Sequence, residues 1–230
     1  MTSGNDAGFT PAKRLKGKVA TIFGGGQSAG EGLGNGRATA LRFAREGARV
    51  LVADKNLESG EETARLVRDE GGEAVAVEAD VTVEKQVKEA ISAAVRRWGA
   101  LHILHNNVGV SVANGDGELT TVSAETLDTQ YRVNFLGTAL ACKHALPIMR
   151  EQRSGAIVNV SSAVATGLSP FAGYKSMKAA INALTEQLAL QNAPFNVRVN
   201  AIMSIGTAFG RIAGTQAAQA ARKEAANAIR

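Results

Sequence analysis

The sequence predicts an α/β fold in which helices cover both faces of a parallel sheet. Short apolar runs rich in Val, Ile and Ala alternate with longer amphipathic stretches along most of the 230 residues. Glycine closes several of the amphipathic stretches, as it does at the ends of many helices. A glycine-rich segment also follows directly after the first apolar run. Strands that alternate with helices in this way are typical of βαβ units.

Each apolar run is interpreted as a strand because it is short and rich in β-branched residues, and each amphipathic stretch as a helix because its apolar positions recur with helical spacing. Right-handed crossovers between parallel strands then give a Rossmann-type, doubly wound sheet with three layers, α/β/α. The expected strands are residues 18–24, 48–54, 74–80, 101–107, 156–162 and 195–202, and the expected helices are residues 37–47, 57–72, 83–99, 123–155 and 174–192. Residues 210–230 are Ala-rich and helical in propensity, and no strand is expected after them.

Length and composition indicate one globular domain, expected at residues 16–230, after a disordered tail at residues 1–15. No apolar run approaches the roughly 20 residues of a membrane span, and the polar start does not resemble a secretory signal. Cys142 is the single cysteine, so no internal disulfide can form, which fits a cytoplasmic location. Cys142 itself is expected in the core rather than as a nucleophile.

Charge and histidine patterns argue against two other classes of function. The net charge is +5, but basic residues are scattered among acidic ones and aromatic residues make up only 4%, so we expect no nucleic-acid partner. His102, His105 and His144 have no convergent set of acidic or thiol ligands at short spacing, so no metal site is expected.

The glycine-rich segment GGGQSAGEGLGNGRATA predicts a dinucleotide site, since glycines let the backbone approach a pyrophosphate and the next helix presents free N–H groups. Two registers fit the segment. We favour Gly24, Gly34 and Gly36, with Asn35 between the last two, because the strand end and the helix start fix these positions. The alternative register uses Gly26, Gly30 and Gly32.

Asp54 ends the second expected strand, 18 residues after Gly36. A carboxylate there can accept hydrogen bonds from both ribose hydroxyls and would repel a 2′-phosphate, which favours NAD over NADP. The neighbouring Lys55 could instead hold the 2′-phosphate, which would favour NADP. The alternative interpretation of Asp54 is a turn or helix-capping aspartate.

Tyr174 and Lys178 are four residues apart and are expected on one face of a helix. A Lys ammonium beside a phenol favours the phenolate, so we expect a lowered Tyr174 pKa and proton exchange with an alcohol or carbonyl oxygen. A serine could hold the same oxygen. The position at the end of the strand favours Ser162, twelve residues before Tyr174, and we prefer it. The spacing favours the alternative, Ser161, which stands thirteen residues before Tyr174.

Together these motifs resemble the short-chain dehydrogenases/reductases, in their compact single-domain branch, over residues 16–202. The resemblance implies an NAD(H)-dependent oxidoreductase that interconverts a secondary alcohol and a ketone, and a homo-oligomer, either tetramer or dimer. It implies that Asp80 and Val81 hold the adenine and that Asn134 binds a water linked to Lys178. The resemblance also implies that four motif residues line the cofactor or brace the sheet, namely Asn106, Asn107, Val108 and Gly109. The catalytic residues that it implies are Asn134, Ser162, Tyr174 and Lys178.

The chain also departs from the family's pattern. Phe23 stands where Thr is usual, and the glycine-rich loop is several residues longer than the common form. Pro-Gly is missing after Ile202, although Thr207 could contact the nicotinamide amide, and the family's last strand is not found in the sequence. These departures keep open an alternative function, an NAD(P)-binding protein with little or no catalysis. Substrate contacts are expected from residues 110–119 and from the segment after Ile202.

Overall fold

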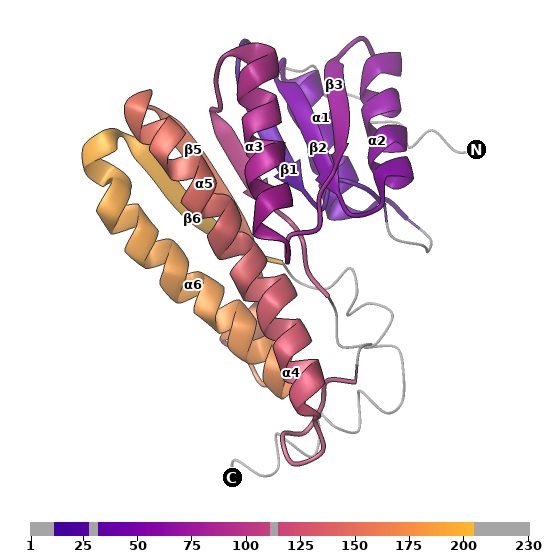
Figure 1. Cartoon of the computed structure of the whole chain (residues 1–230), viewed down its shortest axis with the longest axis vertical. Coiled ribbons are helices and arrows are strands. Elements are labelled where there is room, and N and C mark those ends of the chain that lie inside the picture. Colours follow the sequence, from indigo (N-terminus) through magenta and orange to yellow (C-terminus); the bar gives the residue numbers. More distant parts are fainter. Residues whose placement is uncertain (1–11, 28–31, 111–114, 205–230) are drawn as a thin grey trace.

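The computed structural model describes residues 12–27, 32–110 and 115–204 (Figure 1). Its sheet has six parallel strands in the order β3-β2-β1-β4-β5-β6. The α/β class and the parallel sheet predicted from the alternating pattern are therefore confirmed. The strands are β1 (Val19–Phe23), β2 (Arg49–Asp54), β3 (Glu73–Glu78), β4 (Ile103–Asn106), β5 (Gly155–Ser162) and β6 (Val197–Ser204).

Helices cover both faces of the sheet (Figure 1). On one face, α1 and α2 pack against the first of two apolar cores, which contains Ile22, Val50 and Val52. On the other face, α3, α5 and α6 pack against the second core, which contains Phe23 and Leu51. The helices are α1 (Asn35–Arg45), α2 (Leu57–Asp69), α3 (Glu84–Trp98), α4 (Ala124–Gln130), α5 (Gly137–Glu151) and α6 (Ala172–Asn192).

Apolar residues on both faces of each central strand explain this layering. All five residues of β1 are buried, and consecutive residues point to opposite faces, so Ile22 enters one core and Phe23 the other. Cys142 lies in the second core at 1% exposure, and burial raises the pKa of its thiol to about 12, as expected for a core residue. Gly99 ends α3 in the left-handed conformation, as its position after the amphipathic stretch predicts.

The expected long helix at 123–155 is in fact three segments. A π-helical turn, Tyr131–Leu136, separates α4 from α5 and carries Asn134. The sequence pattern could not distinguish this turn, since one extra residue in a helical turn barely changes the apolar spacing. Such turns frequently occur at functional sites, because they displace one side chain from the regular helical path.

The chain order of the strands reverses between β1 and β4. In open α/β sheets, ligands bind outside the carboxyl ends of the strands at such a point. Those expected site residues that the structure describes lie near these carboxyl ends or on the helices that follow them. Gly30, Thr207 and the region expected to lack a last strand lie outside the described residues.

Of the expected tail, residues 1–11 also lie outside the described part of the chain. The last two residues of the expected tail contact Glu46. Leu15 N–H donates to the Glu46 carbonyl, and Arg14 forms an ion pair with the Glu46 carboxylate at 2.9 Å. Across the described ranges, no helix is both long and apolar enough to cross a bilayer.

Candidate active site

The glycine-rich segment turns sharply after β1 and crosses the start of α1 at very short range. Gly24 has a φ of +72°, and a Cβ on Gly36 would lie 1.9 Å from the Gly24 carbonyl oxygen. Asn107 Nδ2 donates to that same carbonyl at 2.9 Å. Only a residue without a side chain fits at Gly36, so the ends of β1 and β4 and the start of α1 are held together here.

The start of α1 faces this turn. Gly34 is its N-cap residue, and the Gly34 N–H donates to Gln27 Oε1 at 2.6 Å. Asn35 is exposed and begins the helix. The helix has no side-chain cap hydrogen bond within the described residues and no acidic residue in its first turn. A helix start of this kind, with its positive dipole end, suits an anionic group such as a pyrophosphate.

Asp54 is half-buried at the end of β2, beside the glycine-rich segment. Its Oδ2 accepts from Gly26 N–H at 2.9 Å, and its Oδ1 accepts from Asn56 N–H at 3.0 Å. Ser59 binds Gln27 in both directions, accepting from its N–H at 2.7 Å and donating to its carbonyl at 3.0 Å. Asp54 thus anchors the glycine-rich segment, and each oxygen retains a lone pair for a further donor.

Asp80 and Val81 follow β3 at the same edge of the sheet. Asp80 Oδ1 accepts from both the backbone N–H and the hydroxyl of Thr82, at 2.8 and 2.7 Å. Val81 is 5% exposed and packs on Gly137 at the start of α5, where a Cβ would come within 2.6 Å of the Val81 side chain. This contact fixes the turn that the resemblance assigns to the adenine.

The Asn-Asn-Val-Gly motif after β4 divides into bracing and lining residues. Asn106 is buried and donates to Asn159 Oδ1 at 2.8 Å, so it braces β4 against β5. Asn107 holds the Gly24 carbonyl, as described above, and Val108 packs on the same glycine. Gly109 is exposed and leads into the space beside α6.

The two serines at the end of β5 have different partners. Ser161 is 1% exposed and donates to the Lys178 backbone carbonyl at 3.0 Å, so its hydroxyl holds α6 against the sheet. The Ser162 hydroxyl lies beside the Tyr174 side chain, where it favours the phenolate, and it accepts from Val164 N–H at 3.4 Å. Both serines therefore contact α6, Ser161 at the Lys178 carbonyl and Ser162 at the Tyr174 side chain.

Tyr174 lies in the first turn of α6 and is half-buried. Burial raises the pKa of its phenol, and the neighbouring Ser162 hydroxyl opposes this shift to a smaller extent. The expected lowering of the Tyr174 pKa by Lys178 is therefore wrong for this structure. The Lys178 ammonium lies over the ring, 5.6 Å from its centroid, and does not offset the cost of burying a phenolate.

Lys178 lies one turn further along α6 and is 3% exposed. Its Nζ donates to the Val160 carbonyl at 2.9 Å, and burial lowers its pKa to about 8. A buried amine with this pKa changes protonation state within the working range of most enzymes, which makes it a candidate for proton transfer.

The side chain of Asn134, on the π-helical turn, lies next to Gly109, as Lys178 Nζ does. Its Nδ2 donates to the Val110 carbonyl at 3.3 Å and to Gln130 Oε1 at 2.5 Å. Its Oδ1 is buried without a hydrogen-bond partner among the described residues. A Cβ built on Gly109 would lie 3.0 Å from this Oδ1 and 3.3 Å from Lys178 Nζ. One point beside Gly109 is therefore close to both groups.

Asp116 also belongs to this site, although the sequence pattern did not single it out. Its carboxylate accepts hydrogen bonds from the first-turn N–H groups of α6, including that of Tyr174 at 2.6 Å. Helix-cap reasoning looks a few residues before a helix, whereas Asp116 is 58 residues from Tyr174. The sequence signal that could have found it is the missing polar cap at Phe171.

The expected histidines have structural partners or lie in the core. His102 Nδ1 accepts from Val19 N–H at 3.1 Å, His144 Nε2 contacts Glu84 at 2.9 Å, and His105 packs against Phe43. Within residues 12–27, 32–110 and 115–204, no group of three or more His, Cys, Asp or Glu side chains is arranged to hold a metal ion.

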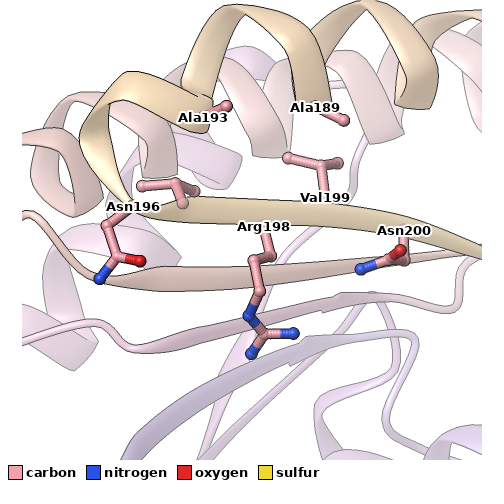
Figure 2. Close-up of a pocket in the computed structure, with 7 residues that line it drawn as sticks. Ala189, Ala193, Asn196, Arg198, Val199 and Asn200 are labelled. Atoms are coloured by element: carbon pink, nitrogen blue, oxygen red, sulfur yellow. The ribbon is translucent and has the colours of Figure 1, made fainter.

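A shallow groove lies away from these residues, along the amino-terminal half of β6 (Figure 2). Figure 2 shows Ala189 and Ala193 on its helical side and Arg198 pointing away from them. Tyr174 and Ser162 do not line this groove, since Ser162 pairs with Ser204 at the opposite end of β6. The groove is therefore separate from the candidate active site.

Comparisons with known proteins agree with this geometry. A model of the short chain dehydrogenase family matches residues 18–222. The uncharacterized oxidoreductase YxjF of Bacillus subtilis is 37% identical over 74% of this chain and 65% of its own length. The 2,5-dichloro-2,5-cyclohexadiene-1,4-diol dehydrogenase LinX of Sphingobium indicum is 36% identical over 85% of this chain and 75% of its own.

A crystal structure from Burkholderia xenovorans, described as that of a short-chain dehydrogenase/reductase, superposes with a TM-score of 0.78. It is 38% identical, and the match covers 83% of this chain and 75% of that one. This chain thus spans about two thirds to three quarters of the length of these three proteins. From the family match, the identities and the superposition, the chain belongs to the short-chain dehydrogenase/reductase family.

Proposed function

We propose that the chain carries the catalytic site of an NAD(H)-dependent oxidoreductase that interconverts a secondary alcohol and a ketone. One observation supports this proposal above the others. The Ser162 hydroxyl lies beside the Tyr174 phenol, and the buried Lys178 amine lies over the same ring. A hydroxyl from β5 and an amine from α6 therefore flank one phenol, an arrangement that suits proton transfer to a carbonyl oxygen.

In this proposal Tyr174 is the general acid in ketone reduction. Its raised pKa keeps the phenol protonated at neutral pH, so it can donate its proton to the substrate oxygen. Ser162 donates to the same oxygen and holds it in place. In the opposite direction, the Tyr174 phenolate accepts the alcohol proton. After each ketone reduction the phenolate must therefore take up a proton, and after each alcohol oxidation the phenol must release one.

Lys178 would exchange that proton, and Asn134 would help to hold a water beside it. Among the described residues Asn134 Oδ1 has no hydrogen-bond partner, and both it and Lys178 Nζ lie next to Gly109. A water that bridges the two groups would accept from Lys178 and donate to Asn134. The pKa of Lys178, near 8, suits an amine that gives and takes a proton close to neutrality.

The residues around the glycine-rich turn fit a dinucleotide. The start of α1 offers its positive dipole end to a pyrophosphate, and Gly24 and Gly36 leave no side chain in the way. Asp54 would receive the ribose hydroxyls, which favours NAD over NADP, and Asp80 and Val81 would border the adenine. A bound nicotinamide supplies or accepts the hydride. Asn107, Val108 and Gly109 would line the rest of the cofactor.

The printed names of two relatives fit an alcohol substrate. LinX is called a diol dehydrogenase, and a relative from Xanthobacter autotrophicus, 37% identical, is called a 2-(R)-hydroxypropyl-CoM dehydrogenase. Both names describe substrates with a hydroxyl group. A cytoplasmic location and a homo-oligomeric assembly, dimer or tetramer, stay predictions from the sequence.

The test has two stages. Calorimetric titration with NAD⁺ and NADP⁺ separately should show tighter binding of NAD⁺, and Asp54→Asn should narrow that preference. Turnover is then measured on a panel of secondary alcohols with NAD⁺ and of ketones with NADH. Tyr174→Phe should keep the dissociation constant for NAD⁺ and lower kcat by roughly 10²- to 10⁴-fold. Tyr131→Phe is the matched control, since Tyr131 is 41% exposed on the π-helical turn.

Retained turnover in Tyr174→Phe would refute the mechanism. Cofactor binding by the wild-type chain without turnover on any member of the panel would favour the alternative function, a dinucleotide-binding protein without catalysis. Tighter binding of NADP⁺ would refute the role given to Asp54.

A further inference from the structure

The helix that carries Tyr174 and Lys178 has no cap of its own. Its N-cap residue is Phe171, which cannot accept a hydrogen bond through its side chain. The cap comes instead from a distant segment after β4. Asp116 Oδ1 accepts from Gly173 N–H at 2.9 Å, and Asp116 Oδ2 accepts from Tyr174 N–H at 2.6 Å.

The neighbouring residue completes this attachment. The Gly117 carbonyl accepts from Ala172 N–H at 3.0 Å, and Gly117 N–H donates to Asp116 Oδ1 at 3.0 Å. The N–H groups of residues 172, 173 and 174 are therefore all bonded to the Asp116–Gly117 pair. Asp116 is only 8% exposed, so its charge is compensated almost entirely by these backbone donors.

The first turn of α6 also packs against Gln130, the residue that accepts a hydrogen bond from Asn134. A Cβ on Gly173 would lie 3.1 Å from Gln130 Cγ and 3.3 Å from Asp116 Oδ1, so these three residues are closely packed. Gln130 is fully buried and accepts from Asn134 Nδ2 at 2.5 Å. Gly173, whose N–H Asp116 binds, thus packs beside the residue that accepts from Asn134.

We propose that Asp116 is a positioning residue for Tyr174, fixing the first turn of α6 so that the phenol meets Ser162. This inference rests on the proposed function of Tyr174. Ser162 belongs to β5 and Tyr174 to α6, so their meeting depends on how the start of α6 is held. A displacement of about 1 Å at a reacting group can lower a rate by as much as 10²-fold.

The Asp116 charge also acts on the phenol. A helix start carries partial positive charge, which by itself would favour the Tyr174 phenolate, and the carboxylate neutralises it. The charged or titratable groups that the structure places against Tyr174 are Asp116 at its backbone and Lys178 over its ring. Replacing Asp116 by a neutral residue should therefore make the phenol ionise at lower pH.

The experiment compares Asp116→Asn and Asp116→Ala with a matched loss of a cap elsewhere. Ser123→Ala is that control, because the Ser123 side chain caps α4 by accepting from Thr126 N–H at 3.1 Å. We expect kcat to fall by about 10- to 100-fold in both Asp116 variants. The dissociation constant for NAD⁺ should change less than twofold, and Ser123→Ala should keep wild-type kcat.

A second readout does not depend on a substrate. The ultraviolet difference spectrum between each protein and its Tyr174→Phe counterpart follows ionisation of this one phenol. The Tyr174 phenol should titrate at lower pH in Asp116→Asn, which keeps the shape of the side chain, than in the wild type. If Asp116→Asn matches the wild type in both phenol titration and kcat, the positioning role is wrong.

The two proposals can fail separately. Wild-type turnover in Tyr174→Phe would refute the catalytic role of Tyr174, while the phenol titration would still decide whether Asp116 controls it. If Asp116→Ala does not fold, kcat and the phenol titration are compared between Asp116→Asn and the wild type alone. A fall in kcat of equal size in Ser123→Ala would mean that loss of a helix cap in general lowers activity, and would overturn the specific role of Asp116.

Discussion

Replacing Gly36 by Ala sets local helix propensity against tertiary packing. Ala is favoured over Gly inside a helix by about 1 kcal/mol, so propensity alone predicts a more stable protein. A Cβ at Gly36, however, would lie 1.9 Å from the Gly24 carbonyl oxygen and 2.8 Å from Asn107 Nδ2. Ordinary contact begins at 3.4 Å, so β1, β4 or α1 must shift substantially. Overpacking of this kind costs about 1–3 kcal/mol, occasionally more, so Gly36→Ala should destabilise by roughly 2 kcal/mol.

The assay is urea unfolding followed by circular dichroism, with Gly60→Ala as control. Gly60 is a buried helical glycine in α2, and its Cβ would meet neighbours at 3.6–3.7 Å, which is ordinary contact. Gly60→Ala should therefore be neutral or stabilising by up to about 1 kcal/mol. Gly36→Ala should also weaken NAD⁺ binding at least tenfold in calorimetry. If Gly36→Ala is as stable as Gly60→Ala and binds NAD⁺ normally, the close crossing at this turn is refuted.

Three further predictions concern two buried titratable side chains and the glycine beside Asn134. Burial lowers the Lys178 pKa from 10.5 to about 8, so between these values the unfolded chain binds more protons and stability rises with pH. Lys178→Met should accordingly exceed the wild type in unfolding free energy at pH 7, by up to about 3 kcal/mol, and a gap that does not narrow between pH 8 and 10.5 would contradict this. Burial lowers the His105 pKa from 6.5 to about 4, so the wild type should lose stability as pH falls through this range, and His105→Phe should lose less in the same denaturation series. Gly109→Ala would place a Cβ 3.0 Å from Asn134 Oδ1 and 3.3 Å from Lys178 Nζ, where it would crowd the proposed bridging water, so kcat should fall about tenfold. Wild-type kcat in Gly109→Ala would contradict a water that bridges these two groups.

The sequence alone determined the sheet and the location of the glycine-rich turn after its first strand. Apolar runs of strand length alternate with amphipathic stretches, and both signals depend only on residues close together in the chain. The register Gly24, Gly34 and Gly36 was favoured for the same reason, because a strand end and a helix start bracket it. In the structure Gly24 follows β1, Gly34 is the N-cap residue of α1, and Gly36 crosses Gly24.

The two serines show where local information stops. Spacing along the chain favoured Ser161 and the strand end favoured Ser162, and neither argument could be decisive. The direction in which each side chain leaves β5 decides which of them meets Tyr174, and this depends on how β5 lies beneath α6. The structure turns Ser161 to the Lys178 carbonyl and Ser162 to the Tyr174 phenol.

Tertiary structure alone decided the Tyr174 pKa and the cap of its helix. The i, i+4 spacing correctly placed Lys178 on the face of Tyr174, but only the packed protein shows that burial outweighs the nearby ammonium. Asp116 reaches Tyr174 across 58 residues, by a contact that no local pattern contains. Periodicity records which side of an element faces the core. Desolvation and hydrogen bonding between distant segments depend on the packing of several elements at once, so they arise only when the chain is folded.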